Sequence, residues 1–424
     1  MSRRFSSLLS IIVFSAATVA AQAERIIVNP VGSPTIAASS IDLPELPFLL
    51  YNEDGSVITD DGVPVIYDAF IDTGASSFAI SYLSARGMES EGLPSLGLDG
   101  VPEGEFVGEF TEIGIGGGET GDVTRPYGVK VLNGLAGTGY SASTSDFIDY
   151  GQHSLWVRRQ VGEGESLYGL LYDPINIVGM PAIQQRVLHI DPTKMYTEGR
   201  LGVNLLEPGS GSIPSTDVTL SVEMRDYLEL TTGTAVPSYA DNPMLKNITL
   251  KHGDLASTDN ELLLDTGGSS SFLCFDKARA IGLIPPQYCT MEQFMAEFTG
   301  TMVPIGGVGE TQYLPIVTLD EFSVQTEEGH VLVWENVELL IVDVPGLPGA
   351  VGMNMLTDAV TIDSLGSITG SSEGAFDAIV FDSTDPDHAH LRLDLNHTLP
   401  EPTTLLLLSP AIVLLRRRRR RTDT

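Results

Sequence analysis

The chain has 424 residues and a formal net charge of −33, because 23 Lys and Arg residues are outnumbered by 56 Asp and Glu residues. This balance excludes a nucleic-acid binder, because phosphate neutralisation needs clustered cations and the arginine run of this chain is confined to residues 416–421. Intrinsic disorder is excluded as well, since 42% of the residues are hydrophobic and 19% are charged. The 44 glycines and 25 prolines predict frequent turns and many short strands.

The N-terminus has the layout of a secretory signal peptide. Arg3 and Arg4 precede an apolar stretch at 8–20, and residues 21–23 (Ala-Gln-Ala) supply the small residues of a cleavage site. A membrane anchor is the alternative, but this stretch is too short to cross a bilayer as a helix. We expect residues 1–23 to be removed and the protein to be secreted, with an extracytoplasmic location in the cell envelope or at the cell surface.

Three motifs follow one another in the first half of the chain. A strand predicted at 63–67 leads toward an Asp-Thr-Gly triplet at 72–74. A glycine-rich turn flanked by β-prone residues lies at 113–120. The third motif is Ile-Val-Gly-Met at 177–180, and a strand-like Leu-His-Ile-Asp segment at 188–191 follows it.

The same three motifs recur in the same order in the second half. A strand predicted at 261–264 leads into Asp-Thr-Gly at 265–267, a glycine-rich turn lies at 305–311, and Val-Gly-Met at 351–353 precedes a strand-like segment at 360–363. A single Asp-Thr-Gly is weak evidence, because turns after strands use Asp and Gly for backbone reasons alone. The ordered repeat is stronger evidence and predicts two units of similar structure.

Other patterns predict the elements that surround these motifs. Segment 207–214 is rich in Gly, Ser and Pro and is expected to link the two units. Further along, two short helices are predicted at 275–282 and 291–298, and three strands are predicted at 331–334, 337–342 and 390–395.

Cys274 and Cys289 are the two cysteines of the chain. Export permits a disulfide, so we expect these residues to form one. The alternative is two separate thiols, because sequence spacing does not fix the distance between the Cα atoms.

The C-terminus consists of Pro-Glu-Pro at 400–402, an apolar run at 405–415 and the arginines at 416–421. This tail resembles the PEP-CTERM sorting signal of bacterial surface proteins, in which an exosortase processes the chain at Pro-Glu-Pro, the apolar run lies in the membrane and the arginines stay on its cytoplasmic side. The resemblance implies that 399–424 is a sorting tail, that a signal peptidase and an exosortase-type enzyme process the chain, and that its membrane contact is transient. An ordinary tail anchor is the alternative, although the apolar run is short for a stable span.

The ordered pair of Asp-Thr-Gly motifs resembles the pepsin-like aspartic peptidases and their single-lobe relatives, the retropepsins, over nearly all of residues 35–370. The resemblance implies an all-β, bilobal pepsin-like acid protease fold with an active-site cleft between two similar β-rich lobes. We expect the N-terminal lobe at 24–208 and the C-terminal lobe at 209–398. The implied activity is that of an aspartic endopeptidase that hydrolyses a peptide or protein substrate with no cofactor and no metal ion.

The resemblance assigns catalysis to Asp72 and Asp265, which would jointly activate the water that attacks the scissile carbonyl. Two neighbouring carboxyl groups share one proton, because like-charge repulsion raises one pKa and lowers the other. Gly74 and Gly267 let the backbone turn tightly beneath the carboxyl groups, and their amides are expected to donate to them.

By resemblance, Thr73 and Thr266 interlock across the lobe interface and hold the dyad rigid. The sequence departs from pepsin-type enzymes at Ala75 and Gly268, where members of that family often carry a hydroxyl that bonds the carboxylate. Without these hydroxyl donors, the ionised carboxylates of Asp72 and Asp265 are less stabilised, so the pKa values of the pair rise. We therefore expect a mildly acidic pH optimum.

The two glycine-rich turns are candidate flaps that close over a bound peptide, and ordinary hairpins are the alternative. The glycines concerned are Gly116, Gly117, Gly118, Gly307 and Gly309. A pepsin-type flap carries a tyrosine near its tip, and the nearest one here, Tyr127, lies beyond the glycines. A turn in each half resembles the retropepsin arrangement, in which each subunit supplies a flap.

A competing interpretation is a catalytically inactive surface protein that keeps the pepsin fold and binds peptides or matrix components. Both Asp-Thr-Gly triplets are intact, which favours the enzyme. The spatial relation of the two carboxyl groups separates the interpretations, because catalysis needs both groups to reach one water.

Overall fold

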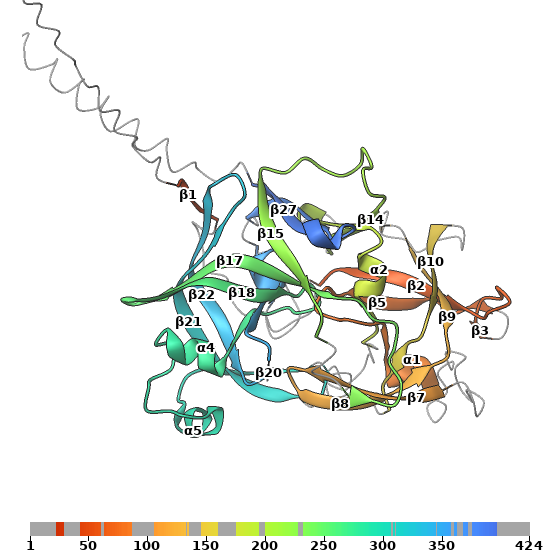
Figure 1. Cartoon of the computed structure of the whole chain (residues 1–424), viewed down its shortest axis with the longest axis horizontal. Coiled ribbons are helices and arrows are strands. Elements are labelled where there is room, and N and C mark those ends of the chain that lie inside the picture. The colour runs from red at the N-terminus through yellow and green to blue at the C-terminus, as the bar shows by residue number, and fades with distance from the viewer. Residues whose placement is uncertain are drawn as a thin grey trace, which may run out of the picture.

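The computed structural model of the chain describes most of the region between residues 23 and 396 (Figure 1). The described ranges are 23–28, 43–60, 63–86, 106–132, 134, 146–159, 175–194, 200–227, 232–306, 308–309, 311–344, 346–357, 360–362, 368–371 and 375–396. The expected signal peptide up to residue 22, the sorting tail and Gly307 lie outside these ranges.

Most regular structure in these ranges is β-strand, so the predicted all-β class is confirmed. Within the described residues, ten strands form a first sheet in the spatial order β10-β9-β2-β5-β12-β6-β11-β8-β7-β16. Its strands are β2 (Glu45–Tyr51), β5 (Tyr67–Ile71), β6 (Ala79–Ile80), β7 (Phe106–Gly114), β8 (Gly117–Thr124), β9 (Tyr127–Leu132), β10 (Phe147–His153), β11 (Trp156–Val157), β12 (Ile177–Val178) and β16 (Thr232–Gly233).

A second sheet has thirteen strands in the described part of the chain, in the order β14-β13-β26-β27-β15-β17-β18-β23-β19-β22-β21-β20, with β1 paired to β22. Its strands are β1 (Arg25–Ile27), β13 (Val187–Asp191), β14 (Gly202–Leu206), β15 (Val218–Arg225), β17 (Asn242–His252), β18 (Leu255–Leu264), β19 (Phe272–Cys274), β20 (Met302–Ile305), β21 (Gln312–Gln325), β22 (Val331–Val342), β23 (Gly349–Val351), β26 (Phe376–Asp382) and β27 (His390–Leu395).

The other described elements are short. They are the strands β3 (Thr59–Asp60), β4 (Val63–Pro64), β24 (Val360–Ile362) and β25 (Ile368–Ser371), the helices α1 (Tyr82–Arg86), α2 (Met180–Ile183), α4 (Phe275–Ala280) and α5 (Met291–Glu297), and the 3₁₀ turns η6 (Met353–Met355) and η7 (Pro386–His388). None of the helices within the described ranges has the length and apolar character needed to cross a membrane.

The two sheets repeat one strand order. The run β2-β5-β12-β6-β11-β8-β7 in the first sheet corresponds to β17-β18-β23-β19-β22-β21-β20 in the second. The pairing directions agree as well, because β5–β12 and β18–β23 are parallel whereas β12–β6 and β23–β19 are antiparallel. The ordered sequence motifs therefore correspond to a repeated topology.

The boundary between the sheets does not follow the expected lobe boundary at 208–209. Strand β13 lies before that position, yet it pairs with β26 in the second sheet, and Val187 lies opposite Asp382. In the other direction, β16 pairs with β7 of the first sheet, and Thr232 lies opposite Thr111. Each half of the chain therefore contributes strands to the sheet of the other, which ties the halves together.

Alternating burial explains the strands that precede the repeated triplets. In β5, Tyr67, Ala69 and Ile71 are buried whereas Asp68 is exposed, as expected for a strand with one covered face. The strand expected at 63–67 is interrupted at residues 65–66, so β4 ends before β5 begins.

Several other predicted elements are confirmed at nearly the expected positions. Helices α4 and α5 and the terminal strand β27 begin at the predicted residues, and turns at 207–217 join β14 to β15. The strands expected at 331–334 and 337–342 are one continuous strand, β22. Asn336 has a φ of 54° within it, so the polar residues between the two predicted strands mark an irregularity and not a chain reversal.

Candidate active site

Asp72 and Asp265 occupy equivalent positions, each directly after a buried strand end. Their backbone amides donate to the carbonyl oxygens of Val178 at 3.1 Å and Val351 at 3.0 Å, respectively. These carbonyls belong to β12 and β23, which run parallel to the strands that precede the two aspartates. The repeated neighbouring strand therefore fixes the place where each carboxyl group leaves the backbone.

The third repeated motif also holds each Asp-Thr-Gly loop from behind. The amide of Met180 donates to Ala75 O at 3.0 Å, and the equivalent amide of Met353 donates to Gly268 O at 2.8 Å. The glycine before each methionine allows this close approach, because a methyl group on Gly352 would lie 2.8 Å from Gly268 O. The sequence repeat thus has a structural purpose at both loops.

The structure brings the carboxyl groups of Asp72 and Asp265 together, and the two groups share a hydrogen bond. A methyl group on Gly74 would lie 2.7 Å from Asp265 Oδ1 and 3.1 Å from Asp72 Oδ1. A methyl group on Gly267 would overlap the carboxyl group of Asp72. Glycine is therefore required at both positions, because any side chain would enter the space of the paired carboxyl groups.

Thr73 and Thr266 form a reciprocal set of four hydrogen bonds between the two loops. Thr73 Oγ1 donates to Leu264 O at 2.6 Å, and Thr266 Oγ1 donates to Ile71 O at 2.7 Å. Each hydroxyl also accepts from the backbone amide of the other threonine at 3.1 Å. Both side chains are buried, so these bonds form away from water and couple the ends of β5 and β18.

Backbone amides surround each carboxyl group. Gly74 N and Ala75 N donate to Asp72 Oδ1 at 2.7 and 3.2 Å. The amides of Gly267 and Gly268 donate to Asp265. A methyl group on Gly268 would lie 2.6 Å from Asp265 Oδ2, so this arrangement leaves no room there for a serine or threonine.

Burial raises the pKa of both Asp72 and Asp265 above the usual range of an aspartate. The shift is larger for Asp265, because the Asp72 charge adds repulsion to the loss of solvent. Hydrogen bonds from Asp265 and from the amides of Gly74 and Ala75 oppose the rise in the pKa of Asp72. The two carboxyl groups therefore titrate as a pair, with one member protonated and the other ionised over an acidic range.

Asn242 is a further site residue that sequence reasoning missed. Its Nδ2 donates to Thr73 O and Gly74 O, each at 3.0 Å, and its Oδ1 accepts from Ser76 Oγ at 2.6 Å. Asn242 is 1% exposed and opens β17 in the second half of the chain. A single asparagine at a strand start has no pattern that would predict this contact with the first loop.

The two glycine-rich turns meet each other. The first joins β7 to β8 and the second lies between β20 and β21. Gly116 N donates to Val308 O at 3.1 Å, and Gly116 and Gly309 form an isolated parallel bridge. Gly117 and Gly309 have φ values of +100° and +92°, while Gly118 pairs with Ile113 in the hairpin ladder. The residues predicted as flaps therefore lie together, except Gly307, which is outside the described residues.

Each turn packs on apolar residues of the opposite sheet. Val308, from the second turn, contacts the cluster that contains Phe110 and Trp156 of the first sheet. Ile113 and Ile115, from the first turn, contact a cluster built from the second sheet. The contact between the turns is therefore an interdigitated one that buries side chains from both halves.

A buried ion pair reinforces this contact. Arg158 donates to Glu119 through Nε at 2.9 Å and Nη2 at 2.7 Å, and both residues are buried. Glu119 Oε2 also accepts from Gly309 N at 3.1 Å, so a carboxylate of the first hairpin holds the second turn. Because the two-point geometry satisfies both charges, the pair fixes the hairpin without leaving a buried charge unpaired.

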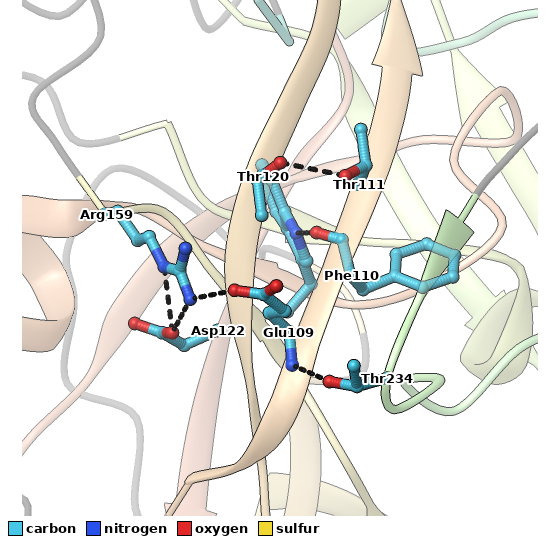
Figure 2. Close-up of polar contacts among 8 residues, drawn as sticks. Glu109, Phe110, Thr111, Thr120, Asp122, Arg159 and Thr234 are labelled. Atoms are coloured by element: carbon cyan, nitrogen blue, oxygen red, sulfur yellow. Dashed lines mark hydrogen bonds and ion pairs between the residues drawn. The ribbon is translucent and has the colours of Figure 1, made fainter.

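The opposite face of the same hairpin carries a solvent-exposed charge network (Figure 2). Arg159 Nη2 donates to Glu109 Oε2 at 2.8 Å and to Asp122 Oδ1 at 2.7 Å. Glu109 N donates to Thr234 Oγ1 at 3.1 Å, which joins the hairpin to the segment that carries β16. Arg158 and Arg159 are consecutive, so their charges serve opposite faces of β7 and β8.

Tyr127 lies at the start of β9, away from the hairpin tip. It is 3% exposed and belongs to the main apolar core. The Arg125 guanidinium lies 4.6 Å from the centre of its ring. Its burial among these core residues accounts for its place in the fold.

The disulfide expected between Cys274 and Cys289 is absent, because both residues are free thiols, and this prediction was wrong. Cys274 N donates to Pro348 O at 3.1 Å, which fixes that residue between β19 and α4. Cys289 N donates to Gln293 Oε1 at 2.9 Å at the start of α5. Different elements therefore fix the two cysteines, with α4 and the segment after it between them.

Neither a scan against known protein families nor a search of the curated proteins matched this chain. Its chemistry must therefore be inferred from its own geometry. Two hydrogen-bonded carboxyl groups, one ionised and one protonated, can accept a proton from a water and donate a proton to a carbonyl oxygen.

Proposed function

We propose that the protein is a secreted aspartic endopeptidase with a bilobal pepsin-like arrangement, in which Asp72 and Asp265 form the catalytic dyad. The observation that carries the proposal is the hydrogen-bonded pair of carboxyl groups at equivalent strand ends of two sheets with one topology. The Thr73 and Thr266 interlock adds support, because it holds the two loops in a fixed relation.

In this proposal a water binds between the two carboxyl groups. Asp72, as the carboxylate, takes a proton from the water. The water oxygen attacks the scissile carbonyl carbon at the same time. Asp265 gives its proton to the carbonyl oxygen, which produces a neutral tetrahedral diol. Asp72 then gives its proton to the amide nitrogen, and a hydroxyl group of the diol gives a proton to Asp265. These transfers break the C–N bond and restore the dyad to its starting protonation state.

The surrounding backbone supports this division of roles. The amides of Gly74 and Ala75 donate to Asp72 and therefore stabilise the form that acts as base. Since burial raises the pKa of both carboxyl groups, the singly protonated state extends to higher pH than in a solvent-exposed pair. We infer a mildly acidic optimum, and a maximum near pH 2 would contradict it.

The meeting glycine-rich turns suggest how a peptide is enclosed. An extended peptide would enter when the contact between Gly116 and Gly309 opens, and closing the turns would exclude bulk water from the dyad. The positive φ values of Gly117 and Gly309 suit a turn that changes conformation without a side-chain penalty.

The termini complete the proposal. Residues 1–23 would direct export, and the tail at 399–424 would direct processing by an exosortase-type enzyme, so the active protein would be displayed at the cell envelope or released. Peptide mass mapping of the mature protein tests both cleavages. Retention of either segment in the mature chain would contradict this part of the proposal.

The activity is tested with casein, an unfolded protein, across a pH series from 2 to 8. The wild-type protein, Asp72→Asn and Asp265→Asn are compared, with and without a statine-type inhibitor. We expect wild-type cleavage that the inhibitor blocks and that each variant lowers by about 1000-fold or more, because catalytic groups that act as a unit fail together. Absence of inhibitable cleavage, with peptide binding retained, would favour the binding protein instead.

A further inference from the structure

Glu112 is an acidic side chain on the inner face of the first hairpin that the proposed mechanism does not use. It lies on β7 directly opposite Glu119 on β8. Side chains of directly opposed residues in an antiparallel pair project from the same face. Because Glu119 is buried against Arg158, Glu112 also lies on the inner face. Glu109 lies on the exposed face, because it is three positions away from Glu112 along the same strand.

The surroundings of Glu112 are acidic and partly dry. The side chain is half-buried, and loss of solvent together with the Asp72 charge raises its pKa to about 7. Charges inside a protein are weakly screened, so the Asp72 charge reaches Glu112 through the interior between the hairpin and the dyad. The inner face of the hairpin therefore contributes a third carboxyl group to the candidate active site.

The described part of the chain provides no cationic partner for Glu112. Arg158 uses its Nε and Nη2 on Glu119, so the one cation described on this face already serves another carboxylate. The backbone amide of Ile113 is the hydrogen-bond donor found at Glu112. A partly buried carboxylate beside another carboxylate either takes up a proton or is stabilised by a positive charge that joins it.

A bound peptide can supply that charge. We propose that Glu112 determines specificity by binding the ammonium or guanidinium group of a Lys or Arg side chain close to the scissile bond. The inference rests on the proposed peptidase function, and it names basic peptides as the preferred substrate class. The hairpin would then recognise the substrate as it closes, because Glu112 and the glycine-rich tip belong to the same strand pair.

The first experiment compares four reactions. Wild type and Glu112→Gln each digest native casein and casein with acetylated lysines, and the cleavage sites are identified by mass spectrometry. We expect wild type to prefer sites next to Lys or Arg and to lose the lysine sites after acetylation. Glu112→Gln is expected to cleave both substrates at similar sites. A wild-type site distribution that ignores basic residues overturns the proposal.

The second experiment uses two peptides that match the preferred site and differ only in Lys or norleucine. A charge-assisted hydrogen bond contributes enough that we expect the Lys-to-norleucine ratio of kcat/KM to fall by about 10- to 100-fold in Glu112→Gln. Glu109→Gln is the matched control, because it removes an acid from the exposed face of the same strand, and it should keep the wild-type ratio. An unchanged ratio in Glu112→Gln overturns the proposal.

A pH series of the same ratio in wild type needs no variant. The charges near Glu112 are Asp72 of the dyad and the Glu119–Arg158 pair on the same face of the hairpin, and titration of the catalytic dyad changes the chemical step for both peptides, so the ratio removes that contribution. Ionisation of Glu112 strengthens its attraction for lysine, so the ratio should rise between pH 5 and pH 7. A flat ratio would count against Glu112 even if Glu112→Gln failed to fold.

Failure of this inference is distinguishable from failure of the proposed function. Casein cleavage that requires Asp72 and Asp265 but shows no basic preference rejects the role of Glu112 alone. Absence of cleavage that depends on the two aspartates rejects both.

Discussion

Asn242→Ala tests whether the second half of the chain positions the first aspartate loop. The variant removes two donated hydrogen bonds of 3.0 Å, to Thr73 O and Gly74 O, and one accepted bond of 2.6 Å from Ser76 Oγ. At about 0.5–1.5 kcal/mol net for each bond, the free energy of unfolding should fall by about 2–4 kcal/mol. Asn242 is 1% exposed, so water cannot readily replace the lost partners.

The same change should alter the titration of the dyad. Asn242 donates to the carbonyl oxygens of Thr73 and Gly74, which belong to the same peptide groups as the amides of Gly74 and Ala75. These two amides donate to Asp72. Those donors favour the ionised carboxylate, so weakening them raises the pKa of Asp72 further. The acidic limb of kcat/KM should therefore move to higher pH, and each unit of movement corresponds to about 1.4 kcal/mol of lost carboxylate stabilisation.

Asn260→Ala is the matched control. Asn260 is 4% exposed, donates to Ile248 O and Ser257 O at 3.1 and 2.8 Å, and lies in the β17–β18 hairpin. Urea unfolding followed by tryptophan fluorescence should give comparable losses of stability for the two variants, whereas the pH profile should move only for Asn242→Ala. Equal movement of the acidic limb in both, or in neither, would refute the positioning role.

Three further predictions follow from the geometry. Gly267→Ala should lower kcat by about 100-fold or more, since the new methyl group displaces the Asp72 carboxyl; kcat within a few-fold of wild type would contradict the close pairing. Arg158→Met should lower the free energy of unfolding in urea by about 3–5 kcal/mol, because Glu119 is left buried and unpaired, and adding Glu119→Gln should restore much of that loss. Glu112 has a pKa of about 7 in the folded protein and 4.5 as a free side chain, so the folded state binds more protons between these pH values and wild-type stability should fall as pH rises from 4.5 to 7. Glu112→Gln should flatten this part of the plot of urea midpoint against pH, and an unchanged slope would contradict the burial of Glu112.

The repeat is recognisable in the sequence because each motif lies where the backbone conformation or a close contact allows few residue types. Gly74 and Gly267 leave space for the opposing carboxyl groups, and Gly352 allows the approach of η6 to the loop. Such positions tolerate one residue type, so they stand out in a single sequence. The all-β class follows from the same strands and turns, and the repeated strand order gives it a physical form.

The parts that sequence reasoning missed depend on contacts between distant segments. Asn242 reaches the first loop only because β17 begins beside it, and Glu112 becomes notable only when the inner face of the hairpin is known. The exchange of β13 into the second sheet is equally invisible, since its alternation would suit either sheet. The cysteine pair shows the converse, because an exported context permits a disulfide but two separate helix starts hold the thiols apart.

Contact between the two glycine-rich turns couples the two halves of the chain. Val308 is held by apolar residues of the first sheet, Ile115 by those of the second, and Gly309 by Glu119, whose charge Arg158 balances. Neither turn can move away from the other without exposing an apolar side chain that packs on the opposite sheet or breaking a backbone contact. In the proposed peptidase, opening would therefore be a joint event of both turns, and a substrate that contacts both turns would stabilise the open arrangement more than one that contacts a single turn.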